Sequence, residues 1–69
     1  MMKTLGETIK ELRVEKGLTQ PQLAETIGVS KGMISIWEHD VNEPKATHVK
    51  NLAIALGTSA DYLLGLKDL

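Results

Sequence analysis

The stretch over residues 19–38, TQPQLAETIGVSKGMISIWE, constrains the fold of this chain more than any other because it contains two helix starts in succession. Thr19 is placed to cap the first helix, and Gln22 follows three residues later, which is the spacing of a capping box. Pro21 falls in the first turn, where its missing N–H costs no hydrogen bond. A short helix is therefore predicted to begin directly after Thr19.

A tight turn over residues 28–30 leads from this helix into a second one. Gly28 ends the first helix, and Ser30 caps the next, which runs over about 31–38. At about 100° per residue, Ile34 and Trp37 form the core side of the second helix. The other side carries Gly32 and Ile36, flanked by Lys31, Ser35 and Met33. Two short helices joined in this way have the layout of a helix-turn-helix, whose second helix is held out to enter a DNA groove.

Three further helices are predicted outside this pair. Apolar residues at helical spacing indicate one over about 5–16 and another over about 46–56, and a short last helix follows Ser59. The segment 39–43 is polar and acidic and predicts a loop. Since no strand pattern is present, the sequence predicts an all-α fold, a compact domain of five short helices.

Length and composition limit the number of domains, the compartment and the kind of partner that this chain can have. A chain of 69 residues predicts a single domain over 1–69, and its 42% hydrophobic residues suffice for a small helical bundle. Cysteine is absent, which fits a reducing compartment. The sequence has no signal-peptide pattern and no run near the roughly 20 apolar residues of a membrane span, so a cytoplasmic protein is expected. The net charge of −1 argues against a nucleic-acid binder unless positive charge is clustered locally.

A series of short motifs occurs in order along residues 4–65. They are Leu18-Thr19-Gln20 with Leu23-Ala24, Ile27-Gly28-Val29-Ser30, Ile34-Ser35 with Trp37-Glu38, Glu43-Pro44, Leu52-Ala53 with Ala55-Leu56-Gly57, and Ser59 followed by Asp61-Tyr62-Leu63-Leu64-Gly65. In this order and spacing they resemble the lambda-type phage repressor and Cro helix-turn-helix family, also called Xre-like. The resemblance implies five helices, with the second and third as the DNA-binding pair, and a dimer on a two-fold-symmetric operator.

The resemblance also implies roles for individual residues. The glutamine matching Gln20 contacts the DNA backbone, and sometimes a base. The positions that face the major groove or its phosphates match Ser30, Lys31, Gly32, Met33, Ser35 and Ile36. Arg13 and Glu38 match a structural ion pair that ties the first helix to the third. The chain departs from the family pattern at Lys31, Gly32 and Ile36, where polar side chains are common, and over 39–42, where Asn-Gly and a basic residue are common.

Each candidate contact has a simpler alternative. Lys31 could donate to guanine or to a phosphate, or it could be a solvated surface lysine. Met33 and Ile36 could contact thymine methyl groups. The alternatives are partial core packing for Met33 and a plain exposed position for Ile36. Gly32 is a poor helix former, which could reflect close approach of the backbone to DNA or neutral drift.

The segment after the second helix of the pair carries mixed charges. His39 and Asn42 could hydrogen-bond to phosphate, whereas Asp40 and Glu43 would repel it. Lys45 precedes a helix whose N-terminus would point toward the DNA backbone. In the C-terminal tail, Tyr62, Leu64, Leu66 and Leu69 are candidates for a dimer contact, although such a tail could equally be frayed or packed locally.

Other classes of function lack a sequence signal. His39 and His48 are nine residues apart and have no partner at metal-ligand spacing, so no metal or other cofactor is expected. No catalytic triad or phosphate-binding glycine loop is present, so no enzyme or small-molecule substrate is expected.

The leading hypothesis is a sequence-specific DNA-binding transcriptional regulator, a phage- or prophage-type repressor acting as a dimer on a pseudo-palindromic operator. The alternative is a protein-interaction module of the same fold, antitoxin-like or degenerate, with weak or no DNA binding. It is motivated by the net charge, the acidic loop, and the apolar Met33 and Ile36. Antitoxins and restriction-modification controllers share the fold, and the chain could be complete or the N-terminal domain of a longer repressor.

Overall fold

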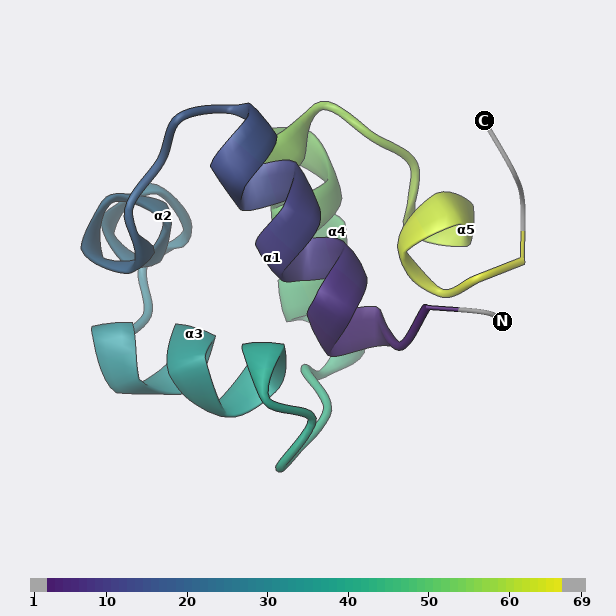
Figure 1. The fold of residues 1–69 in the computed structure, drawn as a ribbon, viewed down its shortest axis with the longest axis horizontal. Coiled ribbons are helices and arrows are strands. Elements are labelled where there is room, and N and C mark those ends of the chain that lie inside the picture. The colour runs from purple at the N-terminus through teal and green to yellow at the C-terminus, as the bar shows by residue number, and fades with distance from the viewer. Residues whose placement is uncertain (1–2, 67–69) are drawn as a thin grey trace.

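The computed structural model describes residues 3–66 and contains five α-helices over that range (Figure 1). They are α1 (Leu5–Glu15), α2 (Gln20–Ile27), α3 (Lys31–Glu38), α4 (Ala46–Leu56) and α5 (Ala60–Leu63). No strand occurs among these residues. The all-α, five-helix fold predicted from the sequence is confirmed, with α2 and α3 as the helix-turn-helix.

The helix boundaries follow from local capping chemistry. At α2, the Thr19 hydroxyl accepts from the backbone N–H of Gln22, and the Gln22 side chain accepts from the backbone N–H of Thr19, which is the expected capping box. Gly28 then ends α2 in the left-handed conformation at φ 76°. The Ser30 hydroxyl accepts from the backbone N–H of Met33 and starts α3. These capping residues therefore determine where α2 ends and where α3 begins.

The core draws on all five helices. α2 packs against α3 and α4, while α1 contacts α3, α4 and α5. Figure 1 shows α1 crossing the middle of the molecule, with α2 and α3 on one side of it and α5 on the other. The buried core side chains are Ile9, Leu12, Leu23, Ala24, Ile34, Trp37, Val49, Leu52, Ala53, Leu56 and Leu63. α3 contacts both α1 and α2, and its buried residues are Ile34, Trp37 and Glu38.

One outer-face position of α3 differs from expectation. Ile36 is half-buried and packs against the core, so its expected place on the exposed side opposite the core is wrong. Met33 is 37% exposed, so it presents apolar surface at the start of α3. α3 packs against both α1 and α2, and helical periodicity alone does not indicate how much of a helix two neighbours will cover.

Candidate nucleic-acid interface

The exposed surface of α3 is concentrated in its first turn. Lys31, Gly32 and Met33 are exposed in succession, while Ile34 directly after them is fully buried. Farther along the helix, Ser35 and Ile36 are half-buried. The structure therefore brings together a cation, a position without a side chain and one apolar side chain at the start of α3. We call Lys31, Gly32 and Met33 the exposed turn.

A buried ion pair fixes the far end of α3 to α1. Arg13 Nε lies 2.6 Å from Glu38 Oε2, and Arg13 Nη2 lies 3.1 Å from Glu38 Oε1. The two side chains are only 11% and 1% exposed. Arg13 Nη1 also donates to the Leu18 carbonyl oxygen at 2.8 Å, in the α1–α2 connection. The expected ion pair between Arg13 and Glu38 is thus present, and it holds three segments of the chain together.

Gln20 is part of the same network. Its Nε2 donates to Glu38 Oε1 at 3.0 Å, so the side chain at the start of α2 is bound to the last residue of α3. The sequence predicts a helix-start role and a DNA contact for Gln20, but not this bond. A partner 18 residues away leaves no periodic signal in the sequence.

The loop after α3 is anchored by Asp40, whose charge by itself indicates only repulsion of DNA phosphates. Asp40 accepts from the Thr4 hydroxyl at 2.6 Å and from the backbone N–H of Gly6 at 3.0 Å. Its carboxylate therefore lies at the start of α1, where the helix dipole favours negative charge. Thr4 also forms a capping box with Glu7, at the same spacing as Thr19 and Gln22, so this part could have been found from the sequence.

His39 is the C-terminal cap residue of α3 and is exposed. Its Nδ1 lies 2.8 Å from the Ser35 carbonyl oxygen. Because a carbonyl oxygen only accepts, Nδ1 carries a hydrogen, and Nε2 is the acceptor nitrogen of the neutral ring. A phosphate could receive a hydrogen bond from Nε2 only when the ring is doubly protonated.

The start of α4 completes this side of the molecule. Lys45 is exposed and is the N-cap residue of α4, and its side chain makes no capping hydrogen bond. α4 also braces α3, because the ring of His48 lies 5.1 Å from the ring of the buried Trp37. The helix that begins directly after Lys45 therefore contacts the buried Trp37 of α3.

The tail residues proposed for a dimer contact fall into two groups. Tyr62 is half-buried against the core of its own chain. Leu64 and Leu66 are 50% and 74% exposed. Leu69 lies outside the described residues. Of these candidates, Leu64 and Leu66 present apolar surface.

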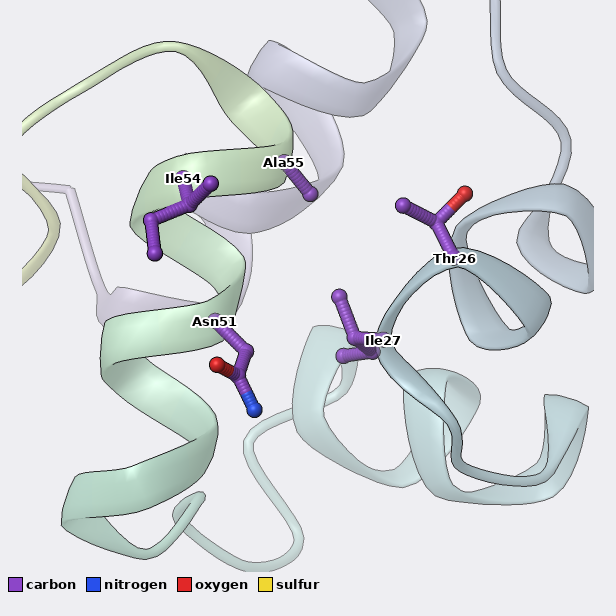
Figure 2. A pocket seen from close by; sticks show the side chains of 5 residues that line it. All are labelled: Thr26, Ile27, Asn51, Ile54 and Ala55. Carbon is purple, nitrogen blue, oxygen red and sulfur yellow. The ribbon is translucent and has the colours of Figure 1, made fainter.

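A shallow pocket of about 240 Å³ lies between α2 and α4 and is lined by Thr26, Ile27, Asn51, Ile54 and Ala55 (Figure 2). None of these five lining residues is an acid or a base, so the pocket offers no proton-transfer pair. Among residues 3–66, no three His, Asp or Glu side chains form a group that could hold a metal ion. In the same part of the chain, no helix has the length and apolar character needed to cross a membrane.

The fold and the exposed turn define a helix-turn-helix domain, and comparison with known proteins identifies its family. A helix-turn-helix family model matches residues 9–63. The chain is 34% identical over 62 residues to the transcriptional regulator ImmR of Bacillus subtilis, covering 90% of this chain and 49% of ImmR. It is 35% identical over 66 residues to the immunity repressor of Bacillus phage phi105, covering 96% of this chain and 46% of that repressor.

One solved structure matches this chain over a larger share of its own length than these two relatives do. The P22 c2 repressor in complex with a synthetic operator superposes with a TM-score of 0.91 at 35% identity, covering 96% of this chain and 100% of that one. This chain therefore belongs to the lambda-type, Xre-like helix-turn-helix family. It spans about half the length of the two curated relatives named above.

Proposed function

We propose that this chain is the DNA-binding unit of a phage-type transcriptional repressor, which binds a pseudo-palindromic operator as a dimer with α3 in the major groove. The exposed turn carries the proposal, because an exposed cation and apolar contact surface are held on a helix whose inner face is buried. Support comes from the similar P22 c2 repressor, whose structure contains operator DNA. The proposal includes a cytoplasmic location and a regulatory rather than an enzymatic role.

The proposed contacts divide into two kinds. Lys31, Gly32, Met33, Ser35 and Ile36 belong to α3 and would face base edges or the nearest phosphates, with the half-buried Ser35 and Ile36 contributing less surface. Gln20, Ser30 and Lys45 would contact the DNA backbone, and His39 would do so through Nε2 in its doubly protonated form. Lys31 and Lys45 are both exposed and would supply the positive charge for these contacts. The carboxylate of Asp40 is held at the start of α1, so its repulsion of phosphate is offset there.

The test is selection of duplexes from a randomised DNA pool by the purified chain at low salt. We expect an enriched two-fold-symmetric sequence whose half-sites are about 34 Å apart, one helical turn, since a dimer places its two α3 helices in successive grooves. The symmetric duplex should bind more tightly than a duplex with one half-site. Leu64 and Leu66 are the proposed dimer contacts.

The control is a duplex of the same composition with the enriched bases shuffled. Failure to enrich any sequence would overturn sequence-specific binding and favour the protein-interaction alternative. Enrichment of a single half-site without symmetry would overturn the dimer while leaving DNA recognition intact.

A further inference from the structure

The ring of His39 is tied to the end of α3 by one of its two nitrogens. Nδ1 lies 2.8 Å from the carbonyl oxygen of Ser35, one turn earlier, and 3.5 Å from the Ser35 hydroxyl oxygen. The same carbonyl oxygen accepts from the backbone N–H of His39 at 3.0 Å. The residue is exposed, and among residues 3–66 no hydrogen bond to Nε2 is formed. Nε2 is therefore the ring nitrogen that can meet a partner outside the chain.

The protonation state of His39 decides what Nε2 can offer to a DNA phosphate. In the neutral ring the single hydrogen is on Nδ1, so Nε2 presents a lone pair, which repels a phosphate oxygen. A second proton makes Nε2 a charged donor, and charged donors form the stronger bonds to phosphate. If the single hydrogen moved to Nε2, the Nδ1 lone pair would face the Ser35 oxygen. A neutral ring therefore cannot serve both partners.

The acidic groups of α3, α1 and the adjoining loop are bound elsewhere. Glu38, directly before His39, is paired with Arg13 of α1, and both side chains are buried. The carboxylate of Asp40, directly after it, accepts two hydrogen bonds at the start of α1. Glu7 of α1 belongs to the capping box of that helix. Within residues 3–66, no carboxylate forms an ion pair with the His39 ring.

The remaining elements around α3 add few charges. α2 has one charged residue, Glu25, which is exposed. From α4, the ring of His48 lies against Trp37. In the connection between α3 and α4, Glu43 and Lys45 are both exposed and opposite in charge. The carboxyl end of α3 itself favours a cation, because the helix dipole is negative there.

We propose that operator binding is coupled to proton uptake by His39, so that the chain binds DNA more tightly as the pH falls from about 8 to about 6. The doubly protonated ring keeps its Nδ1 bond to Ser35 and donates from Nε2 to a phosphate. This coupling rests on the proposed DNA-binding function and adds its regulation by pH. Because the complex holds the second proton more tightly than the free chain does, affinity rises as the pH falls toward about 6.5, where a histidine ordinarily titrates.

The first measurement uses the wild-type chain and the duplex that it enriches. At constant salt concentration, the association constant should rise roughly fivefold for each protomer between about pH 8 and about pH 6. Calorimetric titrations in buffers of different ionisation enthalpy count the protons directly. We expect uptake of roughly half a proton per protomer near pH 7, because some free rings already carry the second proton.

Two variants assign the effect to His39. His39→Asn keeps a side-chain donor at every pH, so its affinity should vary by less than about twofold over the same range. His39→Ala has no donor and should bind about as the wild-type chain does at about pH 8, with no gain at lower pH. His48 is the other histidine of the sequence, so any dependence left in both variants belongs to it or to the amino terminus. Melting temperatures at both pH values establish that each variant is folded.

Three outcomes would overturn the coupling while leaving the proposed function intact. The association constant of the wild-type chain could be independent of pH, or binding could release protons rather than take them up. His39→Asn could also keep the full pH dependence of the wild-type chain, which would place the proton on another group. Failure of the wild-type chain to enrich any duplex would instead overturn the proposed function itself, and the coupling with it.

Discussion

Glu38 shows how a single buried charge can be stabilised in a small domain. Its carboxylate receives three hydrogen bonds, two from Arg13 and one from Gln20, and the side chain is almost fully buried. A buried carboxylate is tolerated only when charged or polar partners replace the lost water. These partners come from α1 and from the start of α2, so one residue sets the position of α3 relative to both helices.

Replacing Glu38 with glutamine should lower the free energy of unfolding by on the order of 3 kcal/mol, because the Arg13 guanidinium would remain buried without a counter-charge. Chemical denaturation at neutral pH measures this loss. Glu11→Gln is the control, since Glu11 pairs with Lys3 at the surface, where ion pairs contribute at most about 1 kcal/mol. Equal losses in the two variants would show that burial does not govern the strength of the Arg13–Glu38 pair.

Residue contacts divide into those a sequence can indicate and those it cannot. The caps at Thr19 and Ser30 depend on neighbours three residues away, and the sequence predicts both. The bond from Gln20 to Glu38 joins two helices, and periodicity carries no information about it. Burial of Ile36 was missed for the same reason, because it depends on how far the neighbouring helices extend around α3.

At the scale of elements, Asp40 joins the end of α3 to the beginning of α1. It adopts a left-handed conformation at φ 57°, and α3 ends through bonds from Asp40 N to Trp37 O and from Val41 N to Ile36 O, the Schellman pattern. Its carboxylate accepts from Thr4 and Gly6. The backbone at position 40 adopts a conformation that favours glycine. The contacts with Thr4 and Gly6 nevertheless require a carboxylate side chain, which glycine lacks.

Substitutions at Asp40 should separate these two requirements. We expect stability to fall in the order Asp40, Asp40→Asn, Asp40→Gly, Asp40→Ala, with a total loss of about 2 kcal/mol. Asparagine tolerates the left-handed conformation and keeps an acceptor for Gly6 N. Glycine keeps only the conformation, and alanine keeps neither. Thermal denaturation of the four proteins gives the order.

A glycine variant as stable as the wild-type chain would show that backbone conformation alone matters at position 40. The long-range bonds of Asp40 could not be predicted from the sequence, because Thr4 is 36 residues away. The helices themselves could be predicted, since each begins and ends through contacts within its own few residues.

At the scale of the whole molecule, a net charge of −1 and a DNA partner are compatible only if charge is distributed unevenly. Lys45 lies at the start of α4, and Lys16 has its ammonium group next to Gly57 at the opposite end of the same helix. The two lysines are therefore a matched pair, one on the proposed DNA side and one away from it. Their comparison tests the proposed orientation of the domain on DNA.

Salt dependence of binding provides that comparison. The logarithm of the association constant falls with the logarithm of salt concentration by about 0.9 for each phosphate neutralised. If Lys45 contacts one phosphate in each protomer of a dimer, Lys45→Ala should make the slope shallower by about 1.8 and weaken binding to all duplexes alike. Lys16→Ala should leave the slope unchanged. Titrations of the enriched duplex at several salt concentrations measure both slopes, and an equal change in the two variants would mean that α4 does not point its N-terminus at the DNA.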